Sequence, residues 1–280
     1  MKRFASLFAA AGAVATVSAF ALAGGAGAAS SLPTLKLTLT GKTGVSISSN
    51  SIPSGAVSIS ATHSGKGGPG SFAIVRLNPN EPASQAISSG FGAVQKSHNN
   101  LDALTATGDL LVVSANAPGP VQTVLKQGTY VALNTTGNGG PSFAQFTVTP
   151  SSSPAALPAA SSTQKAIEFG FKGSRVLKNG TTVRAVNGGY LVHMIDLIGA
   201  KNKAAAVKVL GLLRKNASMK KLHPFLTGQF ISLLNPASPG AMQQQVLNAK
   251  PGYYVEACFM DTQDGREHTQ IGMERLVRVK

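Results

Sequence analysis

The chain repeats one pattern, first as Gln122-Thr-Val-Leu-Lys-Gln-Gly-Thr-Tyr-Val-Ala-Leu-Asn134 and again as Gln244-Gln-Val-Leu-Asn-Ala-Lys-Pro-Gly-Tyr-Tyr-Val-Glu-Ala-Cys258. A Pro-Gly pair precedes each copy, at Pro118-Gly119 and at Pro239-Gly240. Each copy ends in a short run rich in aromatic and aliphatic residues, which predicts a strand. Self-similarity between two halves of a chain indicates an internal repeat. We therefore interpret the protein as a tandem duplication.

Other segments of the two halves also match. Alternating segments begin at Gly55 and at Gly180, and they are followed by Phe72-Ala-Ile-Val-Arg-Leu77 and Val192-His-Met-Ile-Asp-Leu197. Short strands with Gly or Pro between them are typical of a Greek-key β-sandwich. We expect an all-β protein of two such domains, residues 31–149 and 164–280. The Pro-, Ser- and Ala-rich residues 150–163 predict a semi-extended linker.

The second domain is expected to contain a helical insertion from about Asn202 to Leu222. An apolar face at helical spacing supports this prediction; its members are Ala204, Val207, Val209, Leu210, Leu212 and Leu213. A weaker equivalent lies between Pro82 and Leu104 in the first domain.

Composition narrows the class of protein. Of the 280 residues, 43% are hydrophobic and 12% are charged, and the chain holds 31 Gly and 15 Pro, which is too apolar for a disordered protein and too rich in turns for a helix bundle. With one cysteine, Cys258, the chain forms no intramolecular disulfide. Cys258 must therefore be inert, reactive or a ligand.

The N-terminus predicts export. Lys2 and Arg3 precede an apolar run from Phe4 to Ala23, and small residues follow. This pattern is typical of a secretory signal peptide over residues 1–29, with cleavage near Ala28-Ala29. A membrane span is the alternative, but the run breaks at two glycines and lacks a charged flank. We expect a secreted or extracytoplasmic protein without a transmembrane segment in the mature chain.

The formal net charge of +15 lies mainly in the second half. The predicted insertion holds Lys201, Lys203, Lys208, Arg214 and Lys215, with no acidic residue near them. Such runs are commonly solvated helix faces. The functional alternative is the docking of an acidic redox partner or an anionic envelope surface. Nucleic acid is not an expected partner of an exported chain.

Chemistry-bearing residues gather at the end of the second repeat. Cys258 ends a predicted strand, His268 lies in the loop after it, and Gly272-Met273 precedes the closing strand Arg275-Leu-Val-Arg-Val279. Another histidine, His193, lies about 65 residues upstream of Cys258. This arrangement resembles the cupredoxin family, in which two His and one Cys bind copper in a plane and a Met is a weak axial ligand. The resemblance implies His193, Cys258, His268 and Met273 as copper ligands.

The ligand chemistry supports this interpretation independently, because thiolate, thioether and imidazole together suit copper. Nine residues separate Cys258 from His268, more than is usual in the family, so the loop must double back; Asp264-Gly265 can form the turn. Three of the four residues also have a structural alternative, since Cys258 and Met273 can fill a core and His193 can be a hydrogen-bonded core histidine.

The first repeat has Ala73 and Asn134 where the second has His193 and Cys258, so the first domain is expected to lack metal ligands. We expect it to be a spacer, a docking surface or a structural partner. No hydrolase or transferase motif is present, so no enzyme is predicted. The sequence predicts a secreted copper protein for electron transfer or copper handling. The alternative is a copper-free envelope module that acts through its basic surface.

Overall fold

The computed structural model describes residues 32–65, 70–79, 81–97, 100–116, 119–137 and 142–280. The predicted signal peptide and its cleavage site lie outside these residues. No helix in the described ranges is long and apolar enough to cross a membrane.

The first half is a β-sandwich with two helices inserted between β5 and β6. Its strands are β1 (Thr34–Thr40), β2 (Gly44–Ile47), β3 (Ser51–Pro53), β4 (Gly55–Ser64), β5 (Ser71–Arg76), β6 (Leu110–Asn116), β7 (Val121–Leu125), β8 (Gly128–Asn134) and β9 (Phe143–Thr149). One sheet has the order β3-β9-β8-β5-β6, and β7-β4-β1-β2 form the other layer. The helices are α1 (Ala83–Lys96) and α2 (Asp102–Ala106).

The second half has the same order of strands. Its elements are β10 (Ser162–Ile167), β11 (Gly170–Lys172), β12 (Val176–Leu177), β13 (Thr182–Asn187), β14 (His193–Ala200), α3 (Lys203–Arg214), α4 (Met219–Leu222), η1 (His223–Phe225), β15 (Leu226–Ala237), β16 (Met242–Val246), β17 (Gly252–Ala257), η2 (His268–Ile271) and β18 (Glu274–Val279). One sheet has the order β12-β18-β17-β14-β15, and β11-β10-β13-β16 belong to the other layer. The predicted β-sandwich fold with a helical insertion is confirmed.

Alternation of residue types explains these strands. In β1, Leu35, Leu37 and Leu39 are buried while the four residues between and around them are exposed. Side chains of a strand point alternately to its two faces, so this sequence can bury one face and solvate the other. β14 differs, because all eight of its residues are buried. This central strand carries His193 into the interior of the second half.

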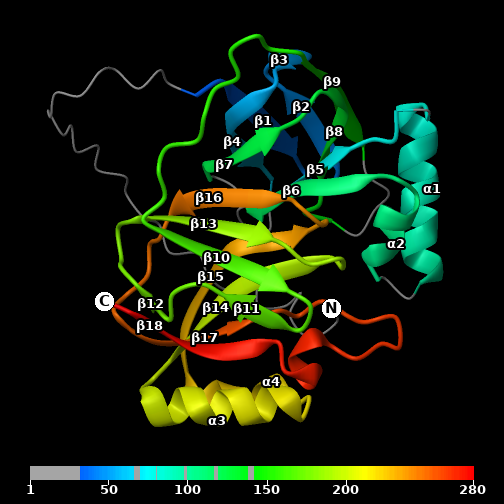
Figure 1. Cartoon of the computed structure of the whole chain (residues 1–280). Helices are drawn as coiled ribbons and strands as arrows, with labels where there is room; N and C mark the ends of the chain where they lie inside the picture. Colours follow the sequence, from blue (N-terminus) through cyan, green and yellow to red (C-terminus); the bar gives the residue numbers. More distant parts are fainter. Residues whose placement is uncertain (1–31, 66–69, 80, 98–99, 117–118, 138–141) are drawn as a thin grey trace, which may run out of the picture.

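The helix α3 lies at the end of the molecule away from the first half, whereas α1 and α2 flank the first half (Figure 1). Asn202 caps α3 by accepting a hydrogen bond from the N–H of Ala205. The buried face is Ala205, Ala206, Val209 and Leu213. Ala204 and Val207 are exposed, so that part of the predicted apolar face is wrong. The buried residues Ala205, Val209 and Leu213 are four positions apart and so stay on one side of the helix. The predicted series that begins Ala204 and Val207 is three positions apart and moves around it.

The two halves share one eight-stranded sheet, because β16 pairs with β7 at Gln244 and Gln122. Side chains reinforce the junction: the Thr123 hydroxyl donates to the carbonyl of Met242 at 2.7 Å. Residues 150–163 run between the halves and hydrogen-bond to both. The N–H of Ala56 donates to the carbonyl of Ala155, and Arg184 donates to the carbonyl of Pro158. The predicted division into two domains joined by a linker stays a prediction.

Candidate metal centre

Three predicted ligands come from separate elements of the second half. His193 begins β14, Cys258 directly follows β17, and His268 begins η2. β14 pairs with β17, and β17 pairs with β18, so the upstream histidine lies beside the closing hairpin as expected. All three side chains are completely buried. Non-local strand pairing therefore assembles the cluster from residues 65 and 75 positions apart in the chain.

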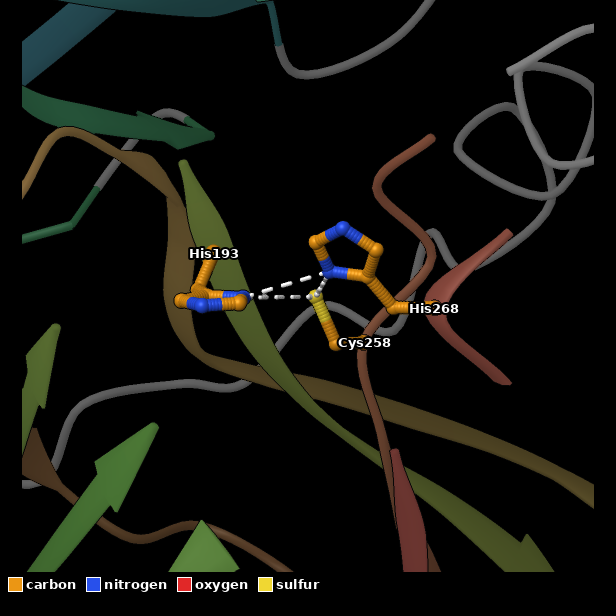
Figure 2. A group of neighbouring side chains, drawn as sticks. All are labelled: His193, Cys258 and His268. Atoms are coloured by element: carbon orange, nitrogen blue, oxygen red, sulfur yellow. Dashed lines mark hydrogen bonds between the residues drawn. The ribbon is translucent and has the colours of Figure 1, made fainter. Parts of the chain in front are cut away.

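The side chains converge through one sulfur and two Nδ1 atoms (Figure 2). Cys258 Sγ lies 3.3 Å from His268 Nδ1 and 3.8 Å from His193 Nδ1, and the two Nδ1 atoms are 3.2 Å apart. Among the described residues, this is the group of His, Cys, Asp or Glu side chains placed to hold a metal ion.

The size of this triangle fits a metal ion. A point equidistant from atoms separated by 3.2, 3.3 and 3.8 Å lies about 2.0 Å from each of them. Zinc–imidazole bonds in proteins are about 2.0–2.1 Å long and zinc–thiolate bonds about 2.3 Å, so a small relaxation around the sulfur would satisfy a first-row metal. A donor set of two imidazoles and one thiolate is suited to copper.

The long loop between Cys258 and His268 doubles back on itself. The N–H of His268 donates to the carbonyl of Met260 at 2.8 Å, and the N–H of Gly265 donates to that of Thr262. Gly265, at the predicted turn, has φ +80°, a left-handed conformation that glycine adopts without steric cost. After the loop, η2 presents His268 to the sulfur. The nine intervening residues therefore do not prevent the approach of imidazole and thiol.

Burial sets the protonation states in the metal-free protein. It lowers the pKa of His193 and of His268 to about 4, so both imidazoles are neutral near pH 7. It raises the pKa of Cys258 to about 12, which keeps the sulfur protonated. Neutral imidazoles can offer lone pairs to a metal at once, whereas the thiol must first lose its proton.

Two residues of the β10–β11 turn, Glu168 and Phe169, lie beside the two histidines. Oε1 of Glu168, in the β10–β11 turn, lies 3.8 Å from Nε2 of His193 and accepts a hydrogen bond from the N–H of Tyr190. The ring of Phe169 meets that of His268 edge-on, with centroids 5.3 Å apart. Phe169 has φ +54°, a left-handed conformation that is uncommon for a bulky residue. Gly189 leaves room for the ring of His193, because a Cβ at this position would lie 2.8 Å from His193 Nε2.

Sequence reasoning missed Glu168 and Phe169. They occupy a short turn between two strands, and no spacing motif connects them with the ligands. The turn signal, Glu168-Phe169-Gly170 between two alternating segments, indicates a hairpin but not what its side chains contact.

The sulfur and the predicted axial ligand have backbone contacts. The N–H of Met194 donates to Cys258 Sγ at 3.4 Å. The N–H of Cys258 donates to the carbonyl of Met273 at 3.2 Å, and the Met273 side chain is fully buried. The backbone of Met273 therefore lies beside that of Cys258. Its role as an axial ligand stays a prediction.

No protein-family model matches the chain, and no curated protein is similar to it in sequence. Solved structures do show similarity. A reduced auracyanin from Roseiflexus castenholzii is 17% identical over 44% of this chain and 99% of its own, with a TM-score of 0.27. A multicopper oxidase is 11% identical over 88% of each chain, with a TM-score of 0.25.

A copper-containing nitrite reductase from Thermus scotoductus is 10% identical over 89% of this chain and 68% of its own, with a TM-score of 0.25. These scores are low, so the description of the site rests on its own geometry. The protein has a β-sandwich fold that carries a buried His-Cys-His cluster, and this donor set is suited to copper.

Proposed function

We propose that the second half of this protein binds one copper ion through His193, Cys258 and His268 and serves in electron transfer or copper handling outside the cytoplasm. The observation that carries the proposal is the convergence of one thiol and two neutral imidazoles, all fully buried, within 3.8 Å of one another. The apolar leader predicted for residues 1–29 supports export.

The residues around the cluster suit a one-electron centre. Copper, when bound, supplies a reversible one-electron couple between Cu(I) and Cu(II). The buried ligands keep water away from the site, and the strand pairing of β14 with β17 holds them in place. The N–H of Met194 can stabilise negative charge on the sulfur. Met273 would supply a weak thioether donor to the bound copper.

The basic helix gives this proposal a docking surface. α3 packs against η2, which holds His268, and also against β17 and β18. Lys201, Lys203, Lys208 and Lys215 are exposed on or beside it. Arg214 instead pairs with the buried Glu274. An acidic redox partner attracted to the exposed lysines would therefore meet the end of the molecule that carries the copper ligands.

Metal uptake and the visible spectrum test the proposal. Purified wild-type protein exposed to Cu(II) or to Cu(I) should retain about one copper per chain, and the Cu(II) form should absorb strongly in the visible range through its copper–thiolate bond. Cys258→Ser should lose the absorption, and His193→Ala and His268→Ala should weaken binding. Val207→Ala, at an exposed position of α3, is a control that should leave both properties unchanged.

The comparison with Cys258→Ser also defines the result that would contradict the proposal. If the wild-type protein retains neither Cu(I) nor Cu(II) above the level of Cys258→Ser, the ligand assignment is wrong. The copper-free envelope module is then the better interpretation. Retention of zinc in preference to copper would likewise reject a copper protein, because copper binds such donors more tightly than zinc does.

A further inference from the structure

A cavity of about 510 Å³ lies between the two halves of the chain. Cavities that bind small molecules typically have volumes of about 300–1,000 Å³. The helices α1 and α2 and the strand β6 line it from the first half, and β14, β15 and the segment after Cys258 line it from the second. Two lining residues, Phe91 and Asn116, are exposed, so the cavity reaches the surface.

The walls of this cavity are mostly apolar. Large apolar side chains come from both halves, and they include Val94, Leu104, Leu111, Met194, Phe259 and Met260. A cavity with such walls favours an apolar molecule, because binding removes apolar surface from water on both sides. A fully charged molecule would lose its hydration there without adequate compensation.

One carboxyl group in the wall forms no hydrogen bond of normal geometry with the described part of the chain. Asp196 lines the cavity and is completely buried, and neither of its carboxyl oxygens makes a hydrogen bond within the described part of the chain. Ser232 lies opposite it on β15, and its hydroxyl is near enough to lower the pKa of Asp196 by hydrogen bonding, although it forms no hydrogen bond of normal geometry among the described residues. A buried polar group that stays unpaired is costly. Such a group in the wall of a cavity points to a ligand.

A second acid in the wall provides a contrast. Asp109 accepts hydrogen bonds from the N–H of Asn78 at 2.9 Å and from the hydroxyl of Thr107 at 3.1 Å, so the protein itself satisfies both of its oxygens. Asp196 is the lining carboxyl whose hydrogen bonds remain to be made. Burial raises the pKa of Asp196 to about 8, so near pH 7 it is an uncharged acid that can both donate and accept.

We propose that this cavity binds a small, uncharged, largely apolar molecule whose hydroxyl or carbonyl oxygen hydrogen-bonds to Asp196. The proposed ligand would lie next to the residues that flank His193 and Cys258. Met194 lines the cavity, and its N–H donates to Cys258 Sγ at 3.4 Å; Met260, another lining residue, follows Cys258 by two positions. A ligand bound in the cavity should therefore change the environment of the Cys258 sulfur. This last consequence alone depends on the proposed copper function.

Fluorescence titration of the metal-free protein with 2-naphthol tests binding itself. The wild-type protein should bind 2-naphthol saturably and about tenfold more tightly than naphthalene, which has the same rings and lacks the hydroxyl. Asp196→Leu should remove this preference while it still allows both molecules to bind. Asp196→Asn, which retains a hydrogen-bonding group, should keep most of the preference.

A matched pair of helix variants locates the site. Val94→Phe adds bulk to the cavity wall on α1 and should weaken binding of both probes by at least about tenfold, since the cavity is then partly filled. Val207→Phe makes the same change at an exposed position of α3 and should have no effect. Thermal unfolding of each variant shows whether the fold is retained, and Ser114→Phe replaces Val94→Phe if that variant does not fold.

Three results would overturn the proposal. They are the absence of saturable 2-naphthol binding to the wild-type protein, equal binding to wild-type, Asp196→Leu and Val94→Phe proteins, and tighter binding of 2-naphthylmethylammonium than of 2-naphthol. The last result would assign the cavity to a cation. None of these measurements uses copper, so failure here is distinguishable from failure of the metal site.

Discussion

The carboxylate of Asp102 in the first half accepts a hydrogen bond of 2.6 Å from the backbone N–H of Val192 in the second half. Val192 directly precedes His193, so a residue of the helix α2 fixes the backbone at the start of the strand that carries a candidate ligand. Burial raises the pKa of Asp102, and this hydrogen bond partly offsets the rise. The first half therefore holds the backbone beside His193 through this hydrogen bond.

Replacement of Asp102 tests whether the first half supports the metal centre. Asp102→Ala should lower copper affinity several-fold, because the backbone before His193 loses its anchor, and it should cost about 1–3 kcal/mol of stability. Asp102→Asn retains an acceptor and should recover most of both losses. Copper affinity is measured by competition with a chelator, and stability by thermal unfolding. Unchanged affinity in Asp102→Ala would show that the two halves are independent at this point.

Glu168 should act on His193 in the same way that a carboxylate orients other metal-bound histidines. Its proximity raises the pKa of His193 against the larger effect of burial. Glu168→Gln should lower the basicity of the imidazole, reduce copper affinity by about tenfold and raise the reduction potential. Glu81→Gln removes the same charge in the first half and serves as the control. Equal potentials for wild type and Glu168→Gln would exclude this role.

Much of the fold and the convergence of His193, Cys258 and His268 could be predicted from the sequence. Alternating segments define strands, and the single Cys at a strand end is followed by His and Met within fifteen residues. The contacts of Asp102, Glu168 and Asp196 could not be predicted. Each depends on how one half packs against the other or on where a turn lies, and no residue spacing encodes such contacts.

The helical insertion shows the same limit on a smaller scale. Its existence follows from apolar periodicity, but which apolar residues face the core depends on the sheet beneath. Ala205 and Ala206 are buried because small residues let α3 approach the sheet closely, whereas Val207 is 55% exposed. Hydrophobicity alone ranks Val207 above both alanines and therefore selects the wrong residue.

Met273→Leu tests the proposed axial ligand. The volume is nearly conserved, so the stability should fall by less than about 1.5 kcal/mol although the side chain is fully buried. Copper should be retained, and the reduction potential should shift, since the axial ligand tunes the potential of such a centre. Voltammetry and the visible spectrum measure the effect. Unchanged potential and spectrum would place the Met273 side chain outside the ligand set.

Salt should control any binding through the basic helix. Adsorption to vesicles of anionic phospholipid should weaken steeply between low salt and 0.15 M, where charges are screened over about 8 Å. Replacement by Gln of all four exposed lysines, Lys201, Lys203, Lys208 and Lys215, should weaken adsorption in the same way. It should not lower stability, because these side chains are exposed. The control replaces Lys165, Lys172 and Lys178, which lie outside the basic helix, by Gln. Adsorption that is insensitive to salt would indicate an apolar contact instead.

Protons released on metal binding test the protonation states of the cluster. With the pKa of both His193 and His268 at about 4 and that of Cys258 at about 12, the metal-free site at pH 7 carries one proton that a metal must displace, on the sulfur. The free protein holds more protons than the complex, so affinity must rise with pH, by about tenfold per unit between pH 5 and 9. Below about pH 4 the imidazoles also become charged, and the dependence should steepen. Anaerobic calorimetry with Cu(I), repeated in buffers of different ionisation enthalpy, counts the protons; Cys258→Ser should release none. Release of two or more protons at pH 7 would mean that an imidazole is charged in the free protein, and release of none would remove Cys258 from the ligand set.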